Sequence, residues 1–105
     1  MSDRLVAVAS LLIDIEHEVR VMGLWESEMP SAEALSSTEP FAIDSLCFPQ
    51  WLQFIFIPKM LFLVDQQSLP ASCSIAPMAE EFFAQSKNAV VLIRHLRAID
   101  NLLSH

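Results

Sequence analysis

The chain contains a single glycine, Gly23, among its 105 residues, together with six prolines. An all-β protein needs many tight turns, and glycine is the residue that most readily adopts their backbone angles. The near absence of glycine therefore argues against a β-sandwich or barrel.

Cysteine is also scarce. Cys47 and Cys73 stand 26 residues apart, without a CxxC motif and without a histidine at metal-ligand spacing. Zinc sites and small disulfide scaffolds need more closely patterned ligands or more cysteines. We therefore expect no metal and no cofactor. The two cysteines could pair, but reduced, buried thiols are the expectation for a cytoplasmic protein.

Basic residues are also few. The chain has six Lys and Arg against thirteen Asp and Glu, which gives a net charge of −7. Residues 1–44 hold nine of the acids and two arginines, whereas residues 45–105 hold four acids and four bases. Binding of nucleic acid depends on cations that neutralise phosphates, so direct nucleic-acid binding is disfavoured. The acidic part forms either a solvated face or a surface for a basic protein partner.

No targeting or membrane segment is expected. The apolar run Leu5–Ile13 follows Asp3 and Arg4, whose charges cancel, so it does not resemble a signal peptide. The longest apolar run, residues 51–64, has 14 residues and carries Lys59 near its middle. A membrane-spanning helix needs about 20 apolar residues, and a lysine at its centre is costly.

Helical spacing dominates the rest of the chain, and the apolar fraction of 53% supplies a core. Two stretches have apolar residues that step by three and four, which is the spacing of one helix face: Leu5, Val8, Leu12, Ile15, Val19 and Met22, then Ala89, Leu92, Leu96, Ile99 and Leu103. Gly23 fits the left-handed end of the first helix. The helices are expected at about 3–22, 49–67, 74–86 and 89–103. They predict an all-α fold, a small four-helix bundle in one domain, 1–105, with a long connection at 25–47.

The apolar run at 51–64 is unusual for a bundle helix, because only Gln53 and Lys59 interrupt its circumference after Gln50. A helix that is apolar all round is expected to be covered all round. Either the 25–47 connection lies over its outer face, or that face contacts a partner or a second copy. Pro58 removes one helical N–H, so we expect a kink there and a carbonyl of Phe54 without its usual donor.

Several short blocks resemble a known family. They are Ser37-Thr38-Glu39-Pro40-Phe41, Asp44, Trp51-Leu52-Gln53, Ile57-Pro58-Lys59-Met60, Leu69-Pro70 and Ala76-Pro77. Over residues 37–78 the chain is similar to the YqcC-like family of small bacterial proteins. The resemblance implies an all-α bundle in the bacterial cytoplasm. Family members tend to be encoded beside a tRNA pseudouridine synthase, which suggests a tRNA-modifying enzyme as partner.

The candidate residues come mostly from these blocks. Asp44 could be a catalytic carboxylate, but a residue of this type before a helix more often caps backbone N–H groups. Trp51 is expected to anchor the core, and Gln53 to bond a loop carbonyl. The binding residues predicted on this basis are Asp44, Trp51, Gln53, Phe54, Pro58, Lys59, Met60 and Phe62.

No catalytic motif occurs, so the sequence predicts a non-catalytic protein-interaction module rather than an enzyme. Its partner would be a tRNA-modifying enzyme of the pseudouridine synthase class, or a second copy in a homodimer. The alternative is a bundle that binds a small apolar ligand beside Pro58, in a pocket lined by Phe54, Met60 and Phe62.

Overall fold

A computed structural model of the chain describes residues 3–104, and every regular element in that range is helical. The long segments are α1 (Asp3–Val21), the continuous run of α3 (Phe48–Trp51), η2 (Leu52–Phe56) and α4 (Ile57–Asp65), then α5 (Ala76–Phe82) and α6 (Val90–Leu103). Single turns are formed by α2 (Ala32–Leu35), η1 (Pro40–Ala42) and η3 (Lys87–Ala89). The all-α prediction and its four main helical segments are confirmed.

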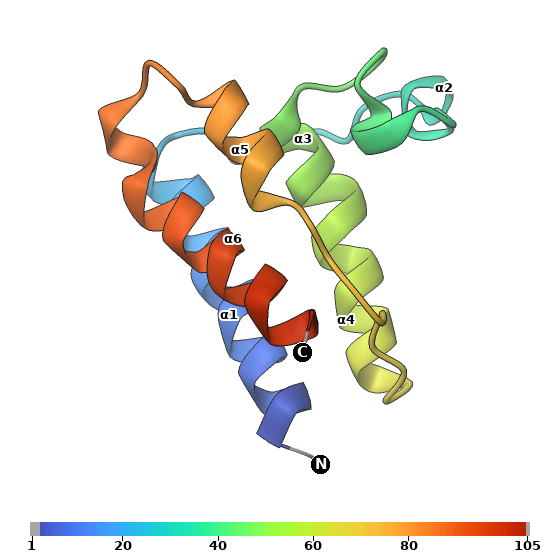
Figure 1. The fold of residues 1–105 in the computed structure, drawn as a ribbon. Coiled ribbons are helices and arrows are strands. Elements are labelled where there is room, and N and C mark those ends of the chain that lie inside the picture. The colour runs from blue at the N-terminus through green and yellow to red at the C-terminus, as the bar shows by residue number, and fades with distance from the viewer. Residues whose placement is uncertain (1–2, 105) are drawn as a thin grey trace.

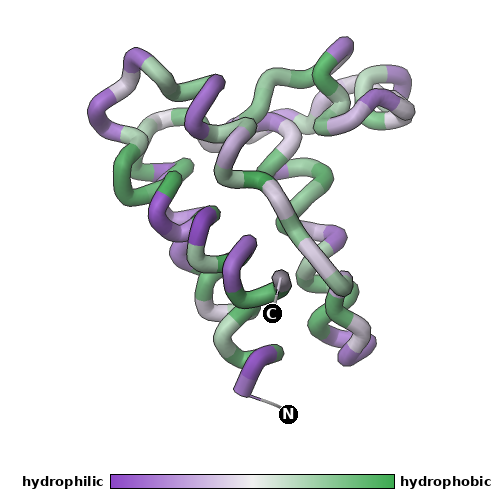
Figure 2. Tube along the Cα trace, viewed as in Figure 1, coloured by the Kyte–Doolittle hydropathy of each residue, from purple (hydrophilic) through white to green (hydrophobic). Residues whose placement is uncertain are grey.

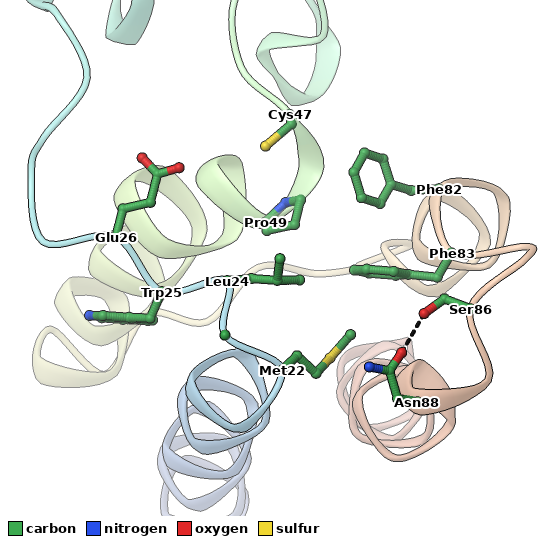
Figure 3. A pocket seen from close by; sticks show the side chains of 11 residues that line it. Met22, Leu24, Trp25, Glu26, Cys47, Pro49, Phe82, Phe83, Ser86 and Asn88 are labelled. Atoms are coloured by element: carbon green, nitrogen blue, oxygen red, sulfur yellow. Dashed lines mark hydrogen bonds between the residues drawn. The ribbon is translucent and has the colours of Figure 1, made fainter.

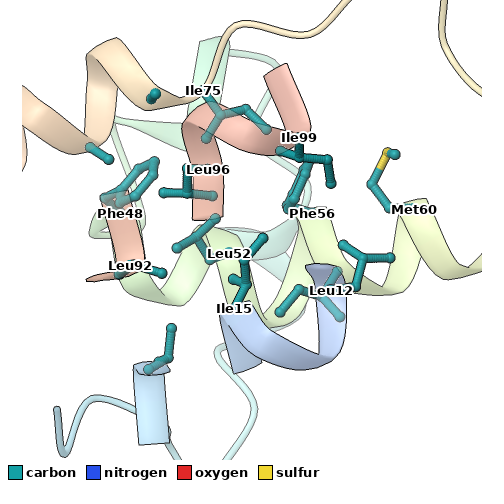
Figure 4. Close-up of a cluster of buried hydrophobic side chains, with 14 of the residues drawn as sticks. Leu12, Ile15, Phe48, Leu52, Phe56, Met60, Ile75, Leu92, Leu96 and Ile99 are labelled. Carbon is teal, nitrogen blue, oxygen red and sulfur yellow. The ribbon is translucent and has the colours of Figure 1, made fainter. Parts of the chain in front are cut away.

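The helices surround one core (Figure 1). α1 and α6 lie side by side in opposite directions, and Arg4 donates to the Leu102 carbonyl at 3.0 Å where they meet. The run α3–α4 packs on α1, and residues 66–75 return along it toward α5. The predicted stripes point inward: Leu12 and Ile15 meet Leu52, Leu96 and Ile99, with Phe48, Phe56, Met60, Ile75 and Leu92 around them (Figure 4).

The end of α1 has the predicted glycine turn. The Leu24 N–H donates to the Val19 carbonyl and the Gly23 N–H donates to the Arg20 carbonyl, each at 3.0 Å. This pair of bonds is the Schellman arrangement, which requires a left-handed residue at the position of Gly23. Gly23 has φ of +73°, in the region that side chains with a Cβ rarely adopt.

We expect Gly23→Ala to lower the free energy of unfolding by about 1 kcal/mol, because alanine at this φ is strained. A Cβ here would meet no heavy atom within 4 Å, so the loss is conformational and not steric. Urea denaturation of both proteins measures it. An unchanged midpoint would show that the turn relaxes without cost.

The helix from 48 to 65 contains a π-helical stretch, Leu52–Phe56, directly before Pro58. The Ile57 N–H donates to the Leu52 carbonyl, one residue further back than in an α-helix. The irregularity expected at the proline thus appears as a widened turn on its N-terminal side. Such turns re-aim every side chain that follows them, which places Met60 in the core.

The 25–47 connection does not cover the outer face of this helix. Phe54 and Ile55 are half-buried, while Pro58, Leu61 and Phe62 are exposed, with Phe62 at 62%. The connection instead extends beyond the N-terminal end of α3 (Figure 1), where Phe41 and the start of the loop are fastened. Of the two alternatives, the one in which the connection lies over the outer face of the helix is therefore wrong, and that face stays open.

The helix 48–65 is hydrophobic along most of its length (Figure 2). Its buried positions include Leu52, Phe56, Ile57 and Val64, which face α1 and the core. Because the open face carries further apolar side chains, this helix exposes more hydrophobic surface than a bundle helix usually does.

Candidate functional site

Gln53 fastens the long connection to the helix. Its side chain is 7% exposed and is the one buried polar side chain within residues 3–104. Its Nε2 donates to the Glu26 carbonyl at 2.7 Å, and its Oε1 accepts from the Glu26 N–H at 2.9 Å. The prediction that Gln53 bonds a loop carbonyl is confirmed. Both backbone groups of Glu26 are satisfied by one side chain.

Gln50 extends this contact to the start of the helix. Its Oε1 accepts from the Cys47 N–H at 2.9 Å, while its Nε2 lies 3.2 Å from both carboxylate oxygens of Glu26. Cys47 is the N-cap of α3, and Gln50 holds the third helical position, where a glutamine commonly bonds back to the cap. The spacing of Cys47 and Gln50 is that of a capping box and is visible in the sequence. It did not single out Gln50, because cysteine is an unusual N-cap residue.

Trp51 lies in a group of aromatic rings at this end of the bundle. Its ring is 4.8 Å from that of Phe41 in an edge-on arrangement and 5.3 Å from that of Phe56 in a stacked one. Phe48 continues the group to Phe83, with ring centroids 6.2 Å apart. Trp51 is half-buried against the core, as expected of an anchor, and Phe41 covers it from the connection.

Two hollows lie beside this aromatic group. The larger, of about 360 Å³, lies between the chain that follows α1, the start of α3 and the end of α5. Figure 3 shows Met22 and Leu24 facing Phe83, with Pro49 and Cys47 at one side. The smaller, of about 210 Å³, is lined by Phe41, Ile43, Leu46, Phe48 and Met78 together with Cys47 and Phe82, and these last two also line the larger hollow.

The connection beside the hollows is acidic. Between residues 21 and 58 the sequence has five acids and no Lys, Arg or His: Glu26, Glu28, Glu33, Glu39 and Asp44. All five are exposed, and Glu26 lines the larger hollow. The nearest cation on α1, Arg20, lies 4.4 Å from the centre of the Trp25 ring and also pairs with Glu16. The acidic excess read from the sequence is thus concentrated at this end of the bundle.

Asp44 does not cap a helix. Its carboxylate accepts from the Ser37 hydroxyl, which in turn accepts from the Glu39 N–H at 3.1 Å. The next helix, α3, begins at Phe48 with Cys47 as its N-cap, so the capping prediction is wrong. Asp44 instead closes a turn of the exposed connection.

The pocket predicted beside Pro58 is not assembled. Met60 is 3% exposed in the core, whereas Phe62 points outward and Phe54 is half-buried. Two residues along an α-helix point in nearly opposite directions, so Met60 and Phe62 cannot line one cavity. Pro58 and Lys59 are both exposed beside Phe62. These residues form an open apolar face, and the hollows lie at the other end of the helix.

The part of the chain that the structure describes, residues 3–104, has no group of three or more His, Cys, Asp or Glu placed to hold a metal ion. None of the helices in that range combines the length and the hydrophobicity that a membrane crossing requires.

Asp100 is a residue that the sequence did not single out. Its carboxylate accepts from the Ile75 N–H at 2.9 and 2.8 Å and from the Ala76 N–H at 2.8 Å, so it caps α5 from the neighbouring helix. The helix runs from Ala76 to Phe82 with Ile75 as its N-cap, so it is shorter at both ends than the predicted range of 74–86. Burial, together with the hydrogen bond and the negative charge of Asp100, raises the pKa of the Cys73 thiol to about 12.

The two thiols should therefore differ in reactivity. Cys47 is exposed in the hollows, and Cys73 is half-buried with a pKa of about 12. Because the thiolate is the reactive form, we expect Cys73 to react with a thiol reagent at pH 8 at least about a hundredfold more slowly than Cys47. Mass spectrometry of timed alkylation measures both rates in one sample. Equal rates would mean that α5 and α6 open readily around Cys73.

The chain is similar in sequence to known bacterial proteins. A protein-family model described as "tRNA pseudouridine synthase C" matches residues 7–102. The chain belongs to this family. Its similarity to YqcC of Escherichia coli, 29% identity over 103 residues, covers 96% of this chain and 88% of that one. The resemblance to the YqcC-like family is thereby confirmed.

Other relatives extend the picture. An "Uncharacterized protein" of Haemophilus influenzae is 34% identical over 95 residues, which cover 90% of each chain. The solution structure of Escherichia coli YqcC is similar, with a TM-score of 0.86 at 26% identity over 98% of this chain and 90% of that one. The "tRNA pseudouridine synthase C" of Pectobacterium carotovorum is 41% identical over 66 residues, which are 62% of this chain but 18% of that protein.

Proposed function

We propose that the chain is a non-catalytic protein-interaction module that binds a tRNA-modifying enzyme of the pseudouridine synthase class. The observation that carries this is the Pectobacterium carotovorum relative. A segment 41% identical to this chain makes up 18% of a protein that bears the name of such an enzyme. Joining two modules in one chain gives each a high effective concentration at the other, which is useful where the separate proteins bind one another.

The chemistry of the chain supports a binding role over catalysis. Residues 3–104 bring together no metal-ligand cluster, and the hollows are lined mainly by apolar side chains. The acidic side chains at that end disfavour contact with phosphates. On this proposal the enzyme contacts the tRNA, and the chain contacts the enzyme. The cytoplasm, where tRNA is modified, is then the proposed compartment.

Two surfaces are available for this role. One is the end of the bundle with the two hollows, and the other is the open face of α4 around Phe62. Apolar surface of this kind marks binding sites on small proteins. A homodimer through the α4 face is the structural variant of the same proposal, and it is compatible with an enzyme bound at the hollows.

The test is a calorimetric titration of this chain into the tRNA pseudouridine synthase C of the same organism. We expect a dissociation constant on the order of 1 µM or tighter, which corresponds to about −8 kcal/mol. The chain alone, incubated with unmodified tRNA, should form no pseudouridine. Absence of binding at tens of micromolar, or pseudouridine formed by the chain alone, would contradict the proposal.

A further inference from the structure

The two hollows adjoin one another, because Phe82 and Cys47 line both of them. Phe82 is 47% exposed although its ring contacts Phe83 at a centroid distance of 4.9 Å. A phenylalanine that stands between two apolar hollows and remains half-exposed offers a ridge over which another chain can lie. Each hollow then receives a side chain on one side of that ridge.

The volumes limit what can enter. The larger hollow, about 360 Å³, is near the lower end of the range of roughly 300–1,000 Å³ for small-molecule sites, and the smaller is about 210 Å³. Spaces of this size suit single bulky side chains better than a nucleotide or a large cofactor. The apolar lining, with Leu24, Pro49 and Phe83 in one and Phe48 and Met78 in the other, favours aromatic or leucine side chains.

The acidic side chains of this chain indicate which charged residues the bound segment should carry. Glu26 is among the residues that line the larger hollow, and Glu28, Glu33, Glu39 and Asp44 follow in a stretch of the connection without a cation. The amide of Gln50 holds the Glu26 carboxylate beside the hollow, with Nε2 3.2 Å from each oxygen. Apolar hollows that have Glu26 and no Lys or Arg among their lining residues, next to the acidic connection, complement a segment in which bulky apolar residues alternate with Lys or Arg.

We propose that the joined hollows bind a basic segment of the partner, with one bulky apolar side chain in each hollow and Lys or Arg against Glu26 and the acidic 26–44 connection. The source of the segment rests on the proposed function. An enzyme that binds tRNA carries Lys and Arg for the phosphates, so it has basic segments to offer. The site thus belongs to a protein partner and not to RNA.

Cys47 provides a native probe of the site. It is exposed and lines both hollows, so an occupant shields it, while Cys73 lies elsewhere and serves as internal reference. The probe is a synthetic peptide with a tryptophan and a leucine among lysines and arginines. At a peptide concentration ten times its dissociation constant, alkylation of Cys47 should slow about tenfold. A peptide with glutamates in place of the basic residues should leave the rate unchanged.

Two variants locate the contact. Phe82→Ala removes the aromatic ring between the hollows. It should raise the dissociation constants of the basic peptide and of the full-length synthase about tenfold or more. Ile13→Ala is the control, because Ile13 is an apolar residue of α1 that is 69% exposed and lines neither hollow, and it should leave both affinities unchanged. Far-ultraviolet circular dichroism confirms that each variant is folded. Raising the salt concentration should weaken the binding of both the peptide and the synthase, since the acidic side chains of the connection are exposed and their charges are screened.

Each outcome decides one proposal. The site is overturned, even if the synthase binds, if the basic peptide fails to protect Cys47. It is also overturned if both variants lose affinity equally. Protection by the peptide without any binding of the synthase keeps the site and overturns the partner class. If Cys47 becomes protected as the concentration of the chain alone is raised, the occupant is a second copy, and the basic segment of a partner is excluded.

Discussion

Replacing Gln53 with leucine is expected to lower the free energy of unfolding by about 2–4 kcal/mol. Leucine fills nearly the same space but cannot bond the Glu26 N–H and carbonyl, which Gln53 holds at 2.9 and 2.7 Å. Leaving partly buried backbone groups without partners costs roughly 1–3 kcal/mol each. For a chain of this size that loss corresponds to a fall in melting temperature on the order of 10–20 °C.

Gln50→Leu is the matched control for this change. Gln50 bonds the same loop residue, but through the exposed carboxylate of Glu26, and it contributes a cap bond at Cys47. Losing these contacts should cost about 1 kcal/mol, as for other caps. Chemical denaturation of both variants gives the comparison. If Gln53→Leu were as stable as the wild type, the connection would not be held by this amide.

Removal of the Asp100 carboxylate is the second large effect. Asp100→Ala deprives the Ile75 and Ala76 N–H groups of their acceptor at the start of α5, and should lower the free energy of unfolding by about 2–3 kcal/mol. The same change should lower the pKa of Cys73, because the hydrogen bond and charge of Asp100 help to raise it to about 12. A lower pKa means more thiolate at a given pH, so Cys73 should react faster.

Asp100→Asn separates the two consequences. Asparagine keeps one oxygen that can accept from the helix N-terminus, so the loss of stability should be only about 1 kcal/mol. The negative charge is gone in both variants, so Cys73 should react faster than in the wild type in both. Alkylation rates measured across pH 8–10 give the comparison. An unchanged rate in the asparagine variant would show that burial alone sets the Cys73 pKa.

Local pattern predicted the parts of the fold that local chemistry determines. The stripe from Leu5 to Val19 is buried as its spacing requires, and Gly23 ends α1 with the expected pair of bonds. Gln53 stood out because it is an amide within an apolar helix, and a buried amide needs partners. These features are determined by residues that are close together in the chain, so they could be predicted from the sequence alone.

Features that depend on distant partners were missed. Asp100 lies 25 residues from the N–H group that it caps, and no spacing rule links the two. The location of the 25–47 connection follows from the Glu26 and Phe41 contacts, which place it at the end of the helix and leave the outer face around Leu61 and Phe62 uncovered. The hollows arise where three chain segments meet, so they had no signature in sequence.

Light scattering coupled to size-exclusion chromatography, applied to a mixture of this chain and the tRNA pseudouridine synthase C of the same organism, tests the interaction most directly. We expect a peak whose mass equals one synthase with one copy of the chain per synthase, and a smaller share of protein in that peak with Phe82→Ala but not with Ile13→Ala. Separate elution of the two proteins at tens of micromolar would contradict an interaction module for this enzyme.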